Sequence, residues 1–389
     1  MWGEAVRIEG LELISFRNYT RLALSLPGSL HLFLGGNGQG KTNLLEAIYL
    51  VATGRSMRAG RDEEMIRWGA PQAEVWLEAE SLRGRYELQV VLTPRGKRAY
   101  VNGNWVRRLG ELLEYLSAVL FVPDDLHLVK GGPEARRRYL DGQLVQALPA
   151  YREALAKFQR ILRQRNRLLD RIGQGEGSAG SLEVWDAAFV EEASRVIHRR
   201  ALAVEALSPL AAEAHQRVAG SKELSLRYRP YFLEETEDEA PTSLDVIRER
   251  VEASLREARP LELRRGTSLV GPQRDDLEMT LDGRSARRFA SQGEQRTVVL
   301  ACKIAELELM ASYLGEYPVL LLDDVLSELD PVRQAAFVEV AMGRTQTLVT
   351  STEATSLPAG LREQGRSYRV RAGQIQPEEE ALRDGSVGG

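Results

Sequence analysis

Residues 30–50, LHLFLGGNGQGKTNLLEAIYL, decide the fold of this chain of 389 residues. Gly35 to Thr42 match the phosphate-binding pattern G-x-x-x-x-G-K-[ST], placed between an apolar strand and a helix. Glycines let backbone N–H groups converge on phosphates at a helix N-terminus, where the helix dipole favours negative charge. We therefore expect a nucleotide site in which Lys41 reaches the β- and γ-phosphates and Thr42 binds Mg²⁺.

A second motif is PVLLLDDVLSELD at 318–330, an apolar run of strand type that ends in two aspartates. We expect Asp323 to bind Mg²⁺ through water, and Asp324 to orient or deprotonate the water that attacks the γ-phosphate. Apolar strands often end in acidic residues, so this motif alone is weak evidence. Paired with the phosphate-binding loop, it predicts a nucleotide-hydrolysing site assembled from both ends of the chain.

The segment ASQGEQR at 290–296 lies one helix upstream of that acidic strand. Ser291 followed three residues later by Glu294 is the pattern of a capping box, in which both side chains only complete a helix N-terminus. The alternative is a signature loop of the ABC type, in which the Ser291 hydroxyl and the Gly293 N–H of one subunit touch the γ-phosphate bound by the other. The position of the segment favours the signature loop and predicts an ATP-dependent head-to-tail dimer.

Hydrophobic periodicity divides the chain into strand-rich and helical parts. Residues 5–34 and 72–109 alternate between apolar and polar positions as strands do, and Asn102-Gly103 is typical of a two-residue hairpin turn. From 131 to 260 apolar residues recur at helical spacing, and strands alternate with helices again after that segment.

We therefore expect an α/β protein, with an ABC-type ATPase lobe assembled from both chain ends and a mainly helical second lobe inserted between them. The expected parts are the N-terminal part of the ATPase lobe at 1–130, the helical insert at 131–260, the C-terminal part of the ATPase lobe with signature loop and acidic strand at 261–372, and a flexible tail at 373–389. A helix of about 20 residues spans only about 30 Å, so we expect no long coiled coil.

Composition excludes several classes of protein. Hydrophobic residues make up 43% of the chain and no apolar run approaches the ~18 residues that span a bilayer. Cys302 is the only cysteine and the four histidines have no ligand spacing, which argues against an internal disulfide and a zinc site. The N-terminus lacks the apolar stretch of a signal peptide. We expect a cytoplasmic protein with no membrane partner.

Four further segments carry specific patterns. They are FRNY at 16–19, TGRSMRAGRDEEMIRWG at 53–69, FVPDDLHLVKGGPEARRRYLD at 121–141 and GPQRDDL at 271–277. Together with the three motifs above, their order closely resembles that of the RecF family, bacterial recombination-mediator ATPases related to the SMC-type ABC ATPases. The resemblance covers about 16 to 352, and the segments at 53–69 and 121–141 are more specific than the phosphate-binding loop alone.

The resemblance implies a Mg²⁺-dependent ATPase that dimerises when it binds ATP. The residues that would contact ATP are Arg17, Asn18, Gly35, Gly36, Asn37, Gly38, Gln39, Gly40, Lys41, Thr42, Asn43, Ser291, Gly293 and Asp330; those that would act in hydrolysis are Asp324, Ser291 and Thr352; those that would hold Mg²⁺ are Thr42 and Asp323. It also implies binding to double-stranded and gapped DNA, and action with RecR and RecO in loading the RecA recombinase during repair, replication restart and SOS induction.

Three positions depart from patterns usual in related ATPases. Gln273 stands where the RecF family usually has histidine, and Asp324 stands where most ABC ATPases have glutamate. A shorter carboxylate reaches the attacking water less well. Thr352 lies in the segment where many ABC ATPases place a switch histidine, and a hydroxyl is a poorer proton relay. We therefore expect slow turnover, stimulated by DNA.

Arginine clusters are the candidates for contacts with DNA phosphates, since arginine binds phosphate oxygens without reading sequence. The candidates are Arg55, Arg58, Arg61, Arg136, Arg137 and Arg138. Residues 81–110 carry seven further basic residues against Glu87 alone, and arginines between 160 and 171 form a third cluster. Each arginine could instead lie on a solvated, salt-bridged surface. Aromatic residues do not alternate with the basic ones, so we expect contacts with duplex backbone and no stacking platform.

Two other classes of function stay open at this point. The ATPase subunit of a transporter would have a membrane partner, but the segment between Lys41 and Asp323 is longer than a compact transporter ATPase uses. A non-catalytic DNA scaffold would keep ATP binding as a structural prop. A steady-state ATPase assay with and without duplex DNA separates these alternatives.

Overall fold

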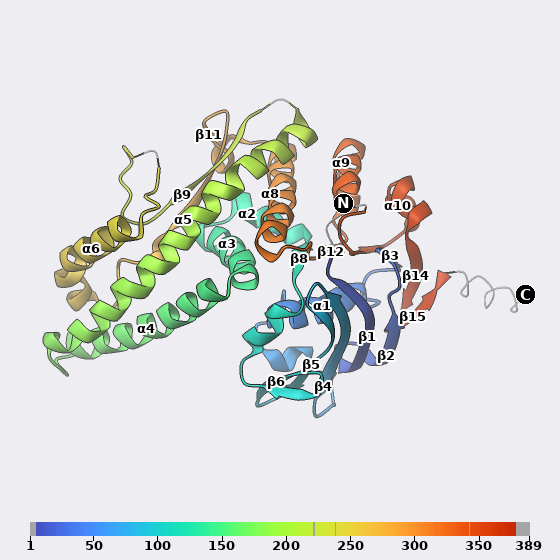
Figure 1. Cartoon of the computed structure of the whole chain (residues 1–389), viewed down its shortest axis with the longest axis horizontal. Helices are drawn as coiled ribbons and strands as arrows, with labels where there is room; N and C mark the ends of the chain where they lie inside the picture. The colour runs from blue at the N-terminus through green and yellow to red at the C-terminus, as the bar shows by residue number, and fades with distance from the viewer. Residues whose placement is uncertain (1–4, 221, 238, 342, 379–389) are drawn as a thin grey trace, which may run out of the picture. The chain divides into compact units, whose positions relative to one another are not determined.

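The computed structural model describes residues 5–220, 222–237, 239–341 and 343–378 (Figure 1). These residues form two compact units. The first unit combines the chain up to Asp125 with the chain from Glu306, and the second is Leu126–Ala305. The phosphate-binding loop and the acidic strand both lie in the first unit.

One layer of the first unit is an antiparallel sheet of six strands in the order β2-β1-β4-β5-β6-β7. Its strands are β1 Arg7–Phe16, β2 Tyr19–Ser25, β4 Ala73–Ser81, β5 Gly84–Thr93, β6 Gly96–Val101 and β7 Asn104–Val106. Asn102 and Gly103 join the last two strands with φ angles of 50° and 76°. The hairpin predicted from these two residues is therefore confirmed, because its turn needs positive φ at both positions.

The other layer is a mixed sheet in the order β15-β14-β3-β13-β12-β8. Its strands are β3 Leu30–Leu34, β8 Ala118–Phe121, β12 Val319–Asp323, β13 Thr347–Ser351, β14 Arg366–Arg371 and β15 Gln374–Pro377. Only β15 is antiparallel to its neighbour. Strand β13 lies between β3 and β12, so the carboxyl ends of these three strands meet at one edge of the sheet, where ligands bind in parallel sheets.

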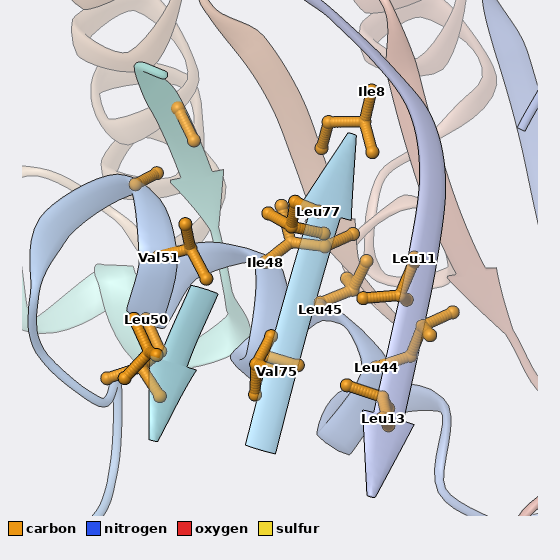
Figure 2. Close-up of a cluster of buried hydrophobic side chains, with 14 of the residues drawn as sticks. Ile8, Leu11, Leu13, Leu44, Leu45, Ile48, Leu50, Val51, Val75 and Leu77 are labelled. Carbon is orange, nitrogen blue, oxygen red and sulfur yellow. The ribbon is translucent and has the colours of Figure 1, made fainter. Parts of the chain in front are cut away.

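Helix α1, Lys41–Thr53, contacts strands of both sheets. Figure 2 shows Leu44, Leu45 and Ile48 of this helix among the side chains of β1 and β4, and all three are fully buried. Because α1 is apolar on more than one face, it is stable only when both faces are covered. This packing fixes the helix whose N-terminus carries Lys41.

The remaining elements of the first unit are short. They are the 3-10 helices η1 Asp62–Met65, η2 Leu109–Glu114, η3 Pro123–Leu126 (which ends at the first residue of the second unit), η6 Leu326–Glu328 and η7 Ala354–Ser356, with helices α9 Pro331–Ala341 and α10 Ala359–Gln364. A buried amide also joins the two sheets. Gln346 Nε2 donates to the Ile8 carbonyl at 2.9 Å, and its Oε1 accepts from the Ile8 N–H at 2.7 Å.

The second unit is mainly helical. Its helices are α2 His127–Lys130, α3 Pro133–Ala147, α4 Pro149–Gly173, η4 Ala179–Leu182, α5 Glu183–Ala219, α6 Leu244–Arg265, η5 Pro272–Arg274 and α7 Ala286–Phe289, and α8 Gln292–Leu314 begins in it. A small sheet in the order β11-β10-β9 completes it, with β9 Leu224–Arg229, β10 Asp276–Leu281 and β11 Arg284–Ser285. Helix α5 has 37 residues, more than expected, and packs on α4 and α6 within its own unit.

The structure differs from the expected division of the chain in two places. Strand β9 lies inside the segment predicted as helical, and it pairs with β10, a strand expected in the ATPase lobe. The second unit also extends to Ala305 and includes the Ser291 motif, which was expected in the ATPase lobe. At the C-terminus, β15 pairs with β14 within the stretch expected to be flexible, and residues 379–389 of that tail lie outside the described residues.

Candidate nucleotide site

The phosphate-binding loop follows β3 and ends at the first residue of α1. Gly40 has a φ angle of 120°, and a Cβ there would lie 2.7 Å from Asn18 Nδ2. A Cβ at Gly35 would lie 2.3 Å from the Val370 carbonyl oxygen. Glycine is therefore required at both positions, because the loop passes close to β14 on one side and to the turn after β1 on the other.

The Lys41 side chain lies inside the loop and is 4% exposed. Its Nζ donates to the carbonyl oxygens of Gly35 and Gly36, at 2.7 and 3.2 Å. The same Nζ lies 3.6 Å from Asp324 Oδ2. The ammonium thus joins the loop to the carboxylate expected to act on the attacking water, and it lies where such a lysine meets the β- and γ-phosphates.

Asp323, at the end of β12, accepts hydrogen bonds from hydroxyls on two other elements. Thr42 Oγ1 of α1 donates to Asp323 Oδ1 at 2.9 Å, and Thr350 Oγ1 of β13 donates to the same atom at 2.8 Å. Thr350 Oγ1 also accepts from the Asp324 N–H at 3.0 Å. The structure therefore brings together the two residues expected to hold Mg²⁺, and adds Thr350, whose positioning contact with both aspartates was not predicted.

The oxygen atoms of Thr42 and Asp323 fit a magnesium ion that binds together with a nucleotide. Burial raises the pKa of the Asp323 carboxyl, against the opposing hydrogen bonds from Thr350 and Thr42, so a nearby cation would stabilise its charged form. One carboxylate and one hydroxyl are hard oxygen ligands, and Mg²⁺ is commonly held by few protein groups together with substrate phosphates. In the part of the chain that the structure describes, no group of three or more His, Cys, Asp or Glu side chains could hold a metal by itself.

The turn after β1 places Asn18 against the phosphate-binding loop. Asn18 Nδ2 donates to the Gln39 carbonyl at 2.9 Å, and Asn18 Oδ1 accepts from Asn43 Nδ2 at 2.6 Å. On the other side, the Ala372 N–H donates to Gln39 Oε1 at 2.7 Å. Three of the residues expected to contact ATP therefore form one hydrogen-bonded group around the loop.

Glu46 is a residue of this site that the motifs did not reveal. Its fully buried carboxylate accepts two hydrogen bonds of 2.8 Å from Arg17, one of 2.5 Å from Ser56 and one of 3.1 Å from Arg58. Burial alone would raise the pKa of Glu46, but Arg17, Ser56 and Arg58 together outweigh it and hold the pKa below its ordinary value. The one signal in the sequence is an acidic residue within the apolar helix. Arg58, expected at DNA, is thus held beside the nucleotide site, where it also contacts Asn43.

Thr352 and Asp330 have different surroundings. Thr352 is exposed and lines, with residues of the phosphate-binding loop, a pocket of about 570 Å³. Asp330 caps helix α9, because its Oδ1 accepts from the N–H groups of Val332 and Arg333, both at 3.1 Å. The hydrogen bond from the Arg333 N–H is the largest of the effects that lower the pKa of Asp330. The Asp330 carboxylate is therefore engaged in a structural contact.

The Ser291 motif of the second unit forms a complete capping box. The Ser291 N–H donates to Glu294 Oε2 at 2.7 Å, and the Glu294 N–H donates to Ser291 Oγ at 3.3 Å. Lys222 Nζ lies 2.6 Å from Glu294 and, with the bonds from Ser291, lowers the pKa of Glu294 to about 2. Ser291 is exposed at the N-terminus of a long helix. The capping box therefore leaves the serine side chain exposed at this helix N-terminus.

Besides Arg58, three of the arginines expected at DNA are exposed. Arg61 lies 3.4 Å from Glu63, Arg138 lies 3.9 Å from Glu134, and Arg55 is open to solvent as well. Exposed pairs of this kind contribute little to stability, so they leave these guanidinium groups free to exchange partners. The geometry is thus compatible with phosphate contacts at these three positions.

Arg136 was expected to contact DNA, but it is buried. It is 5% exposed, and its guanidinium donates to both oxygens of Asp276, at 2.6 and 2.9 Å. The neighbouring Arg137 donates to the Asp275 carbonyl at 2.7 Å. Arg136 is therefore a structural residue whose guanidinium is not accessible to a DNA phosphate, and residue spacing could not reveal this because Asp276 is distant in the chain.

Two of the segments that carry the family resemblance also meet in a buried charge network. Arg200 is 3% exposed and pairs with Asp141 at 2.9 Å and with Asp275 at 3.0 Å, which joins the segments at 121–141 and 271–277. Arg165, from the arginine cluster at 160–171, is fully buried and pairs with Glu262 at 2.6 Å. Breaking a buried pair leaves an uncompensated charge, at a cost of about 3–5 kcal/mol, so these residues hold the second unit together.

Gln273, which stands where the RecF family usually has histidine, makes a local contact. Its Nε2 donates to the Val270 carbonyl at 2.7 Å.

A phosphate-binding loop that faces an acidic strand end of the same sheet, with a second unit that carries a serine motif, defines an ATP-binding protein of the ABC type. The family described as RecF/RecN/SMC N terminal domain matches residues 7–373. The relatives include the DNA replication and repair protein RecF of Synechococcus sp. (strain JA-3-3Ab), 43% identical over 96% of this chain and 98% of the relative. RecF of Gloeobacter violaceus is 44% identical over 89% of this chain and 92% of the relative. The chain belongs to the RecF family.

Known structures agree with this assignment. A solved structure of the recombination mediator protein RecF-ATP in the RecFOR pathway matches with a TM-score of 0.88 and 28% identity, covering 96% of this chain and 98% of that chain. An Smc head domain from Pyrococcus furiosus, 17% identical with a TM-score of 0.53, covers 98% of this chain and 99% of that chain and shares the fold. The expected α/β fold of an ABC-type ATPase is confirmed. Among the described residues, no helix has the length and apolar character needed to cross a membrane.

Proposed function

We propose that this protein is an ATP-dependent recombination mediator of DNA repair and replication. The observation that carries the proposal is the convergence of Lys41, Thr42, Asp323 and Asp324 on one edge of a parallel sheet. The similarity to RecF proteins over nearly the whole chain supports the same function. The same similarity argues against the alternative that the protein is the ATPase subunit of a transporter. A bacterial DNA repair protein of this kind would act in the cytoplasm.

The contacts of the site suggest how ATP would be bound and cleaved. Lys41 would hold the β- and γ-phosphates against the loop, and Asn18 and Asn43 would keep the loop in place. Thr42 and Asp323 would hold Mg²⁺, which supplies charge neutralisation at the phosphates when bound. Asp324 would orient the attacking water, with its backbone fixed by Thr350. The short Asp324 side chain supports slow hydrolysis, and we propose that DNA stimulates it.

Dimerisation would place the exposed Ser291 of one subunit against the γ-phosphate bound by the other. We propose that this closed dimer binds double-stranded and gapped DNA through Arg55, Arg61 and Arg138, and that hydrolysis reopens it. With RecR and RecO as partners, the closed state would promote RecA loading on single strands. The similarity to a solved RecF protein of the RecFOR pathway supports these partners.

Gel filtration with ATP, with ADP and with neither tests this function. We expect a dimer with ATP alone, and retention of duplex DNA by that dimer. The Lys41→Met variant is the matched control and should stay monomeric in all three conditions. ATP turnover measured with and without duplex DNA distinguishes the mediator from a non-catalytic scaffold, which would bind DNA and ATP without turnover.

A further inference from the structure

The capping box at Ser291 places a full negative charge at the helix end that would meet a phosphate of another subunit. The Glu294 carboxylate accepts from the Ser291 N–H at 2.7 Å, so its charge lies beside the serine. Hydrogen bonds from Lys222 and Ser291 lower the pKa of Glu294 to about 2, and the carboxylate is therefore ionised at neutral pH. Like charges brought together at an interface oppose association. The loop thus needs a nearby cation before it can close on a nucleotide.

Lys222 supplies a cation at this carboxylate. Its Nζ lies 2.6 Å from Glu294 Oε1, although the two residues are 72 positions apart in the chain. The backbone around Lys222 is itself held in place. His215 Nδ1 of α5 donates to the Lys222 carbonyl at 3.0 Å, and the Glu223 N–H donates to Asp282 Oδ1 at 3.0 Å. Because its backbone is fixed, Lys222 loses less conformational entropy when it forms the ion pair.

This ion pair contributes little to the stability of the fold. The side chain of Lys222 is 44% exposed and that of Glu294 is 31% exposed, and pairs this open to solvent are usually worth little. The pair of Arg165 with Glu262 is different, because both of its side chains are fully buried. The consequence of the Lys222 pair therefore lies in its position beside Ser291, where it cancels a negative charge.

We propose that Lys222 is a positioning residue for the ATP-dependent dimer: it holds Glu294 in the capping box and neutralises its charge, so that Ser291 can approach the γ-phosphate bound by the other subunit. Ser291 Oγ accepts from the Glu294 N–H, and its own proton is left for a phosphate oxygen. The inference rests on the proposed function, because it requires that Ser291 meets a phosphate. Lys222 lies outside all the motifs of the sequence, and only the folded chain brings it to the loop.

The test is the dissociation constant of the dimer in the presence of ATP, measured by static light scattering over a range of protein concentrations. Lys222→Ala should raise this constant roughly 10- to 100-fold, because a like charge then opposes the phosphate in each of the two sites. The ATP affinity of the monomer and the melting temperature should stay those of the wild type. Lys222→Arg should dimerise nearly as well as the wild type, because the cation is retained.

The matched control is Lys157→Ala. Lys157 is a half-exposed lysine of the same unit, and it pairs with Glu153 at 2.8 Å on helix α4. Its substitution also removes one positive charge and one exposed ion pair, but not at the Ser291 loop. Lys157→Ala should therefore dimerise as the wild type does, and an equal defect in both variants would show that only the net charge of the protein matters.

A second substitution separates charge compensation from a purely structural contact. Glu294→Gln removes the negative charge but keeps an oxygen for the Ser291 N–H, because glutamine also completes a capping box. The double variant Lys222→Ala/Glu294→Gln should therefore recover the dissociation constant of the wild-type dimer. The defect of Lys222→Ala alone should also shrink as the salt concentration rises, because salt screens exposed charges.

The role of Lys222 is overturned if Lys222→Ala dimerises like the wild type, if the double variant is as defective as Lys222→Ala, or if salt leaves the defect unchanged. The proposed function fails in a different way, through an ATP-dependent dimer of Ser291→Arg or a wild type that stays monomeric with ATP. A monomeric Ser291→Arg together with a fully dimeric Lys222→Ala would remove the role of Lys222 alone.

Discussion

Thr42 Oγ1 donates a 2.9 Å hydrogen bond to Asp323 Oδ1, although the two residues are 281 positions apart in the chain. The bond connects the N-terminus of α1 to the end of β12. Together with the contact between Lys41 and Asp324, it fixes two residues of the phosphate-binding loop against two residues of the acidic strand. The chain's own contacts therefore hold these four residues of the nucleotide site together, and conservative substitutions there should change function more than folding.

Lys41→Met should remove most of the affinity for ATP, because the ammonium that bonds the loop carbonyls is lost. A hydrogen bond to a charged group contributes about 1.5–3 kcal/mol, so a loss of at least tenfold is expected. Methionine has a similar length and keeps the fold. An equilibrium titration with a fluorescent ATP analogue measures this, and wild-type affinity in the folded variant would contradict the role of Lys41.

Asp324→Asn should leave ATP binding and dimerisation intact and slow hydrolysis by a factor on the order of 10²–10⁴, the usual contribution of a positioned base. The substitution suits the backbone, because Asp324 has a φ angle of 53° and asparagine tolerates the left-handed region. ATP-bound dimers should accumulate. Steady-state phosphate release measures the rate, and turnover equal to that of the wild type would exclude Asp324 as the residue that acts on water.

Ser291→Arg should bind ATP as a monomer, because a bulky cation blocks the approach of this loop to a second subunit. Static light scattering with ATP measures the mass. Ser291→Ala is the comparison, since it also loses the hydroxyl that caps the helix, at a cost of about 1 kcal/mol, without adding bulk, and it should weaken the ATP-dependent dimer less than Ser291→Arg does. An ATP-dependent dimer of Ser291→Arg would show that this loop is only a helix cap.

The free energy of unfolding should fall as the pH drops from about 6.5 to about 4. Burial, with a smaller contribution from the charge of Arg366, lowers the pKa of His31 from 6.5 to about 4. In this range the unfolded chain takes up a proton at His31 while the folded chain does not, so stability rises with pH. The full effect is at most about 3 kcal/mol. Urea unfolding of the wild type and of His31→Gln should differ in pH dependence over this range, and parallel curves would contradict the assignment.

Features set by neighbouring residues were predictable from the sequence. The phosphate-binding loop, the acidic strand and the Asn102-Gly103 turn each depend on the local conformation of a few residues, and each was found at its predicted place. Features that depend on pairing between distant segments were not predictable. Strand β9 forms because β10 lies beside it, and Arg136 is buried because Asp276 receives it. The role of Glu46 likewise depends on its ion pairs with Arg17 and Arg58, which form only in the folded chain.

Strand β3 and the loop after it are made well before β13, the strand that β3 pairs with on one side. A ribosome adds about 5–20 residues per second, so Asp323 follows Thr42 by roughly 15–55 s. During that time the loop exists without its acidic partner, and β3 has no parallel neighbour. Competence to bind ATP is therefore a property of the finished chain, and an interrupted translation product carries the loop without the site.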